Sequence, residues 1–282
     1  MNSKTGALYI VATPIGNLDD MTFRAVEVLK QADLVLAEDT RHASILLRHF
    51  NIRTPLLSCH EHNERKRAPE VMDRLVQGQQ ISLISDAGTP LISDPGYPLV
   101  REARRKGLRV VPIPGASAII AALSASGLPT DRFYFGGFIP AKPGPRREYV
   151  ELLVDTPWTS VFYESSHRIL QTMEQICDSL GHKRQVAVAR ELTKKYEQFY
   201  IGEAQHVLNQ ISAGPDNQKG EFVIIVGGAA DVVADDSGAK RLLELLIEEL
   251  PLKTACKIAA KWSGLNRNQL YQLGLEIQSV GE

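Results

Sequence analysis

The sequence has few cysteines, no long apolar run and almost no net charge. Its cysteines, Cys59, Cys177 and Cys256, are far apart and odd in number, so neither a disulfide framework nor a CxxC metal site is indicated, and a reducing cytoplasm is expected. No apolar stretch approaches the roughly 20 residues that cross a bilayer, so no membrane partner is expected. The formal net charge of −1 leaves only local basic patches as a basis for binding nucleic acid.

The chain also lacks the glycine patterns of the common nucleotide-binding loops. Its first candidate loop, Thr13–Asn17, reads TPIGN and matches neither GxGxxG nor GxxxxGK[ST]. The proline in this loop removes a backbone donor where a pyrophosphate would need one. NAD and ATP are therefore disfavoured as ligands.

Three strand-like segments each end at a cluster of small, turn-forming residues. The segments and their loops are LYIVA before TPIGN, ISLI before SDAGTPLISDPG, and RVVPI before PGAS. Ligands of open α/β sheets bind beyond the carboxyl ends of the strands. We therefore expect the three loops to converge on one ligand.

The order of predicted elements indicates an α/β chain of two domains with a helical tail. Strand-like and helix-like segments alternate up to Ala125, which is typical of a largely parallel sheet. The Pro-rich residues 138–147 indicate a stiff connector or exposed loop, and we place the domain boundary before them. The predicted domains are 1–128, 129–230 and 236–282, with strands of the second domain at 160–163, 186–190, 199–201 and 222–226, and tail helices at 240–249, 253–262 and 266–278.

Two polar clusters are candidates for chemistry. Cys59–His62 reads CHEH and contains zinc ligand types, but neighbours on a strand point to opposite faces, so a solvated turn or a substrate-facing loop is favoured over a metal site. Glu38–His42 reads EDTRH and follows a buried strand at the edge where the ligand loops are expected. This second cluster is either a set of catalytic groups or an acidic helix N-terminus that favours the helix dipole.

Six motifs in a fixed order resemble a known family. They are VATPIGNLDD, SDAGTPLISDPG, VVPIPGASA, FYESSHR, ELTKKYE and KGEFVIIVGG. In these motifs the chain is similar to the S-adenosylmethionine-dependent methyltransferases of the tetrapyrrole-methylase fold. Most of that family have a glycine-rich first loop and Gly-Asp-Pro in the second, whereas this chain has TPIGN and Gly88-Thr89-Pro90. The departure favours the branch that acts on ribosomal RNA over the porphyrinoid branch.

The resemblance implies a cofactor trough between two α/β domains, followed by a small helical C-terminal domain. It implies S-adenosylmethionine as the cofactor and requires no metal. The residues implied to contact the cofactor lie on the strand-end loops and on the second domain. They are Pro14, Gly88, Thr89, Pro90, Ile92, Ser117, Ala118, Phe162, Leu192 and Glu221.

The resemblance further implies 2′-O-methylation of a cytidine ribose in the decoding region of 16S rRNA in the 30S subunit, by a homodimer. Because a ribose hydroxyl is weakly acidic, we look for a general base, and the candidates are Glu38, Asp39 and His42. Lys194 is expected to steer phosphate or lower the pKa of the hydroxyl, with surface ion pairing as the alternative. The cations expected to contact RNA are Arg41, Lys142, Arg146, Arg147 and Lys195, with a weaker contribution from Lys253, Lys257 and Lys261 of the tail.

Two other functions remain open from the sequence. One is a porphyrinoid C- or N-methyltransferase on the same fold, which would need a wide trough without basic rims. The other is a catalytically silent module for nucleotide binding or assembly, which would bind the cofactor without turnover.

Overall fold

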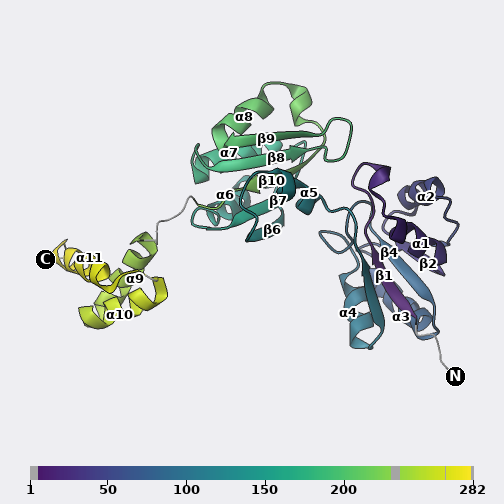
Figure 1. The fold of residues 1–282 in the computed structure, drawn as a ribbon, viewed down its shortest axis with the longest axis horizontal. Coiled ribbons are helices and arrows are strands. Elements are labelled where there is room, and N and C mark those ends of the chain that lie inside the picture. The colour runs from purple at the N-terminus through teal and green to yellow at the C-terminus, as the bar shows by residue number, and fades with distance from the viewer. Residues whose placement is uncertain (1–5, 230–235, 264, 281–282) are drawn as a thin grey trace.

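A computed structural model describes residues 6–229, 236–263 and 265–280, which form two α/β domains and a separate group of three helices (Figure 1). The first domain contains a parallel sheet in the strand order β3-β2-β4-β1-β5, as the alternation of elements predicts. Its strands are β1 (Ala7–Val11), β2 (Leu34–Ala37), β3 (Leu56–Ser58), β4 (Gln80–Ile84) and β5 (Arg109–Ile113), and its helices are α1 (Phe23–Gln31), α2 (Thr40–His49), α3 (Glu64–Val76) and α4 (Tyr97–Arg105).

Helices cover both faces of this first sheet. Alternate residues of a strand point to opposite faces, so β4 contributes Ile84 to the core under α1 and α2, and Leu83 to the core under α3 and α4. The covering of both faces explains why these strands are almost continuously apolar. It also leaves the carboxyl edge of the sheet as the place where loops meet.

Side-chain caps set where the first two helices begin. The Thr22 hydroxyl accepts a hydrogen bond from the Ala25 backbone N–H at 3.1 Å, so Thr22 is the N-cap of α1. The Asp39 carboxylate accepts one from the Arg41 N–H at 2.8 Å. As a result α2 starts at Thr40.

The second domain has a mixed sheet in the order β6-β7-β10-β8-β9, in which β10 is antiparallel to both neighbours. The four strands predicted in this domain are present, whereas β6, α6 and α8 were not predicted. Its elements are β6 (Phe133–Phe138), α6 (Pro143–Glu151), β7 (Thr159–Ser165), α7 (Ile169–Leu180), β8 (Gln185–Arg190), β9 (Gln198–Glu203), α8 (Ala204–Ser212) and β10 (Glu221–Val226).

Two structural features bear on the Pro-rich stretch and on the predicted domain boundary. Residues 139–142 form a loop between β6 and α6. Residues 138–147 are not a connector, because α6 begins at Pro143, a first-turn position where proline costs no hydrogen bond. In addition, α5 (Ala118–Ala125) packs through Ile119 and Leu123 on the second sheet (Figure 1). By packing, α5 is therefore associated with the second sheet, although it lies inside the predicted span 1–128.

The three predicted tail helices are present as α9 (Asp236–Glu249), α10 (Leu252–Ser263) and α11 (Arg267–Val280). They surround a small core of their own that includes Leu243, Cys256 and Leu270. Across the described parts of the chain, no helix combines the length and apolar character needed to span a bilayer.

Candidate active site between the two domains

The three predicted loops do converge at the carboxyl edge of the first sheet. Thr13 and Gly88 exchange two backbone hydrogen bonds, at 2.9 and 3.1 Å. The Thr89 hydroxyl donates to the Ala116 carbonyl at 3.1 Å. These bonds join the loops after β1, β4 and β5 into one surface.

A cavity of about 470 Å³ lies between this surface and the second domain, within the usual size of small-ligand sites. Its walls include most of the predicted cofactor residues, namely Gly88, Thr89, Ile92, Ser117, Ala118, Leu192 and Glu221, together with Lys194. The other lining residues are Ile15, Ala87, Ser93, Asp94, Phe138, Tyr163, Glu164, Ser165, Ser166, Gly220, Phe222 and Val223.

Three predicted cofactor residues do not line the cavity. Pro14 and Pro90 are buried next to loop residues that do, so they shape the loops from behind. Phe162 is fully buried in the core on the opposite face of the second sheet, where its ring meets Tyr149. Its neighbour Tyr163 faces the cavity instead, because alternate residues of β7 point to opposite sides.

Unfavourable backbone conformations concentrate around the cavity. Of the five non-glycine residues with positive φ in the described chain, four flank it: Leu91 at 73°, Ser93 at 66°, Glu191 at 50° and Thr193 at 65°. Each such conformation costs about 1 to 3 kcal/mol and persists where function requires a particular loop shape. The strain therefore supports the cavity as the functional site independently of its size.

The acidic cluster at the end of β2 contains one good candidate base and one poor one. A hydrogen-bonded ion pair with Arg41, 2.7 Å between Arg41 Nη2 and Asp39 Oδ2, holds the pKa of Asp39 well below its usual range. The pKa of Glu38 is instead raised, first by burial and then by the carboxylates of Asp86 and Asp94. A weakly basic, ion-paired Asp39 is a poor proton acceptor. Glu38 does not line the cavity itself, but it lies within electrostatic range of Asp94 on the cavity wall, so it is the better candidate of the two.

Asp94 is a site residue that the sequence did not single out as catalytic. It lines the cavity, and burial raises its pKa. Burial, and secondarily the charge of Asp94, raises the pKa of the Tyr163 phenol to about 12. Asp94 is therefore close enough to influence both Tyr163 on the cavity wall and Glu38 at the next strand end. The only indication of Asp94 in the sequence was its place in the Asp94-Pro95-Gly96 turn of the loop after β4.

Two of the predicted cations, Arg41 and Lys194, form ion pairs with neighbouring carboxylates. Burial lowers the pKa of Lys194, but hydrogen bonds to Glu221 and Glu191 outweigh burial and leave that pKa above its ordinary value. Arg41 is paired with Asp39, and His42 is exposed on the first turn of α2. Lys194 thus orders the cavity wall as an ion-pair partner, which is the alternative to its predicted role in steering phosphate.

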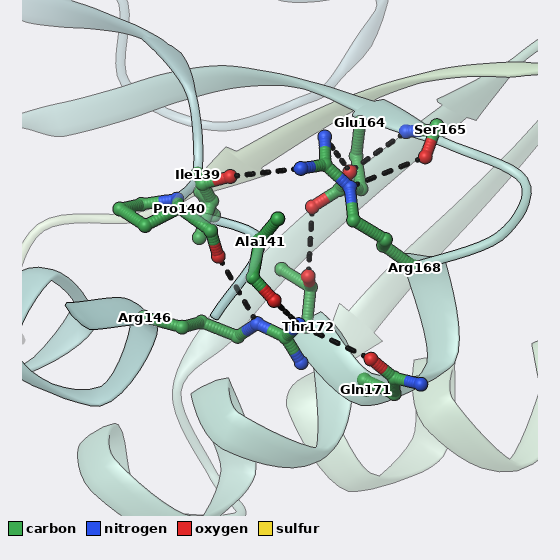
Figure 2. Close-up of polar contacts among 9 residues, drawn as sticks. All are labelled: Ile139, Pro140, Ala141, Arg146, Glu164, Ser165, Arg168, Gln171 and Thr172. Carbon is green, nitrogen blue, oxygen red and sulfur yellow. Dashed lines mark hydrogen bonds and ion pairs between the residues drawn. The ribbon is translucent and has the colours of Figure 1, made fainter. Parts of the chain in front are cut away.

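A buried network fixes the part of the second domain that faces the cavity (Figure 2). The Glu164 carboxylate, almost fully buried, accepts hydrogen bonds from the Ser165 N–H at 2.8 Å and the Thr172 hydroxyl at 2.7 Å, and pairs with Arg168 at 2.8 Å. Arg168 in turn donates to the Ile139 carbonyl at 3.4 Å. The network therefore ties the Ser165–Ser166 turn, which lines the cavity, to the loop that follows Phe138, the cavity-lining last residue of β6.

The same view corrects the role predicted for Arg146. This side chain is only 5% exposed and donates to the carbonyls of Pro140 and Ala141 and to the Gln171 amide oxygen (Figure 2). It satisfies carbonyls of the Pro-rich loop and is not available to RNA. Arg147 is exposed but paired with Glu151 at 2.7 Å.

Two predicted RNA contacts remain accessible, and the zinc alternative gains no support. Lys142 is exposed before α6, and exposed Lys195 lies over the Tyr196 ring, 5.5 Å from its centroid. Burial raises the pKa of the Cys59 thiol to about 11, which disfavours the thiolate that would bind a metal. Within the described residues, no three potential metal ligands cluster.

Comparison with known proteins decides the family. A model for tetrapyrrole (corrin/porphyrin) methylases matches residues 7–208, and one for the RsmI C-terminal HTH domain matches residues 233–278. The chain belongs to the tetrapyrrole methylase family. The motif resemblance is thereby confirmed, and the helical tail is covered by the second model.

Curated relatives place the chain more closely within this family. Ribosomal RNA small subunit methyltransferase I of Pasteurella multocida is 48% identical, covering 98% of this chain and 99% of the relative. The protein of the same name from Escherichia coli O157:H7 is 49% identical, covering 98% and 97%. These are methyltransferases of matching length, so the two α/β domains and the tail align as one unit.

Solved structures share the fold at low sequence identity. Cobalt precorrin-4 methyltransferase CbiF superimposes with a TM-score of 0.58 at 19% identity, covering 80% of this chain and 96% of that one. A diphthine synthase gives a TM-score of 0.59 at 15% identity, covering 79% and 90%. They confirm the predicted two-domain architecture.

If the cavity holds the S-adenosylmethionine that the motif resemblance implies, substituting Gly88 with alanine should weaken its binding at least about tenfold. Gly88 has a φ of +76°, and a Cβ there would lie 3.3 Å from Ile15 Cγ2 on the cavity wall. Gly107 has nearly the same φ, +70°, with nothing within 4 Å of its Cβ position. Gly107→Ala therefore imposes the same left-handed strain, about 1 to 2 kcal/mol, away from the cavity. Titration calorimetry on both variants separates loss of the cavity from loss of stability; equal affinities would refute the assignment.

Proposed function

We propose that this chain uses S-adenosylmethionine to methylate the ribose 2′-hydroxyl of a cytidine in the decoding region of 16S rRNA, acting on the small ribosomal subunit. The observation that carries the proposal is the similarity, over nearly the full length of the chain and at 48–49% identity, to relatives named ribosomal RNA small subunit methyltransferase I. Charge and shape at the interdomain cavity supply independent support.

The cavity residues fit the cofactor. Its walls combine apolar side chains such as Ile15 and Leu192 with small residues whose backbone groups are accessible, and they carry the carboxylates of Asp94 and Glu221. The only cationic side chain among the lining residues, Lys194, is neutralised by Glu191 and Glu221. An acidic wall with apolar contacts suits an adenosine joined to a sulfonium cation. When bound, S-adenosylmethionine supplies an electrophilic methyl group.

The protein residues would then position the hydroxyl and remove its proton. Alignment of two reactants can contribute about 7 to 11 kcal/mol, and a base at hydrogen-bonding distance roughly 10²- to 10⁴-fold. The raised pKa of Glu38 makes its carboxylate a stronger base than an ordinary one, and this carboxylate would take the proton from the ribose oxygen. Asp94, on the cavity wall, would orient the hydroxyl or share the proton.

Transfer of a labelled methyl group tests the proposal against its alternatives. The full chain is incubated with methyl-labelled S-adenosylmethionine and with 30S subunits, naked 16S rRNA or uroporphyrinogen. We expect label in 16S rRNA, with 30S subunits the better acceptor. Label in uroporphyrinogen would support the porphyrinoid branch. Cofactor binding without any transfer would support a silent module. The homodimer stays a prediction, which light scattering of the free protein can check.

A further inference from the structure

A basic groove lies on the outer side of the first domain, between α3 and α4, apart from the interdomain cavity. These helices pack against each other on one face of the first sheet, in the lower part of the first domain in Figure 1. The groove has a volume of about 670 Å³. Its lining includes four cations, Arg65, Arg101, Arg105 and Lys106, and one carboxylate, Glu102.

Two of the four cations are not neutralised by the protein. Glu102 pairs with Arg105 at 2.7 Å and Lys106 at 4.0 Å. In the ranges that the structure describes, neither Arg65 nor Arg101 forms an ion pair with a carboxylate, and both are exposed. Because a single carboxylate faces four cations, the groove presents an excess of positive charge.

The shape of the groove suits an extended polyanion. Tyr97, Arg101 and Arg105 recur every four residues and so share one face of α4, which at nine residues is about 13 Å long. The lining also includes Ala68 and Pro69, whose short side chains leave room for a backbone to approach. Tyr97 is 63% exposed at one end, where its ring can stack on a base.

The groove starts at the edge of the sheet that carries the candidate active site. The loop that lines the cavity through Gly88 and Asp94 leads directly into α4. The Gly96 N–H donates to the buried Glu64 carboxylate at 2.7 Å, which holds the starts of α3 and α4 together. Arg65 and Tyr97 therefore lie at the catalytic edge, and Arg105 lies toward the opposite edge.

We propose that the α3–α4 groove binds the phosphate backbone of the RNA substrate and leads it away from the catalytic cavity. This inference rests on the proposed function and adds a binding surface to it. It also replaces Arg146 and Arg147 as the main RNA contacts, since the first is buried and the second is paired. Ribose-phosphate chains are recognised through such cations without regard to sequence.

The test is the salt dependence of 30S binding by the double variant Arg65→Ala with Arg101→Ala. Removing one cation that touches a phosphate reduces the log–log slope of affinity against salt by about one, so the slope should fall by about two and the affinity at low salt severalfold. Arg65→Lys with Arg101→Lys should retain most of the slope, because a phosphate is attracted by the charge. Melting temperature and S-adenosylmethionine affinity should stay at wild-type values.

A matched control removes two arginines from the other face of the same sheet. Arg24 on α1 and Arg48 on α2 are both exposed, and their double alanine variant should bind 30S subunits like the wild type. If Arg65→Ala with Arg101→Ala also binds like the wild type, or if the lysine variant is as weak as the alanine one, the groove proposal is wrong. Continued methylation of 16S rRNA in that case leaves the proposed function standing; a wild-type chain that neither binds nor methylates 30S subunits contradicts both.

Discussion

Arg168→Ala should destabilise the second domain by about 3 to 5 kcal/mol, the usual effect of leaving a buried charge without its partner. The Glu164 side chain is 1% exposed and Arg168 only 24% exposed, so removing the guanidinium would leave a largely buried carboxylate without its charge partner. A loss of this size should lower the melting temperature by at least about 6 °C. Differential scanning calorimetry of the full chain measures this shift.

Two variants show whether the burial of the pair is the cause. Arg147→Ala removes an exposed arginine from the same domain, whose partner Glu151 is 45% exposed, and should change stability by no more than about 0.5 kcal/mol. Glu164→Gln combined with Arg168→Met removes both charges and should recover much of the loss. A melting temperature for Arg168→Ala equal to that of Arg147→Ala would contradict this role of the network.

Glu38→Gln should slow methyl transfer by roughly 10²- to 10⁴-fold while leaving S-adenosylmethionine affinity near its wild-type value. The substitution keeps the shape of the side chain but removes its ability to accept a proton. Asp39→Asn should have a much smaller effect, because Arg41 already occupies that carboxylate. Single-turnover rates at saturating 30S subunits measure both variants. A wild-type rate for Glu38→Gln would assign the base to Asp94, which Asp94→Asn then tests.

The raised pKa of Glu38 also predicts opposite pH trends for activity and stability. Activity requires the ionised carboxylate, so the rate should rise as pH increases through the raised pKa. A carboxyl whose pKa is higher in the folded state binds protons more tightly there, so its contribution to stability falls as pH rises between the unfolded and folded pKa values. At neutral pH, Glu38→Gln should therefore melt at a higher temperature than the wild type, and at pH 4 the difference should shrink.

The loops of the candidate site were predictable because their local chemistry is unusual. Small residues such as Gly88 directly follow apolar strands, and only a few conformations satisfy such a turn. Their convergence then followed from the rule that the carboxyl ends of parallel strands share one edge. The bonds between Thr13 and Gly88 confirm that reasoning.

The residues placed differently by the structure depend on contacts that a sequence does not display. Phe162 and Tyr163 are both aromatic, and only the register of β7 decides which one faces the cavity. Arg146 looks like a surface cation in a Pro-rich stretch, yet prolines lack N–H groups and leave carbonyls that a guanidinium can satisfy. The apolar α5 gives no indication of which of two sheets it covers.

The most direct test of the central claim is alkaline hydrolysis of 16S rRNA after transfer of a labelled methyl group by the full chain. Alkaline cleavage of RNA needs a free 2′-hydroxyl next to the phosphate, so a 2′-O-methyl group protects the bond that follows it. We predict that the label appears in an alkali-resistant dinucleotide whose first nucleoside is 2′-O-methylcytidine. Label recovered in mononucleotides would place the methyl group on a base and contradict ribose methylation, and RNA without label would contradict the proposed substrate.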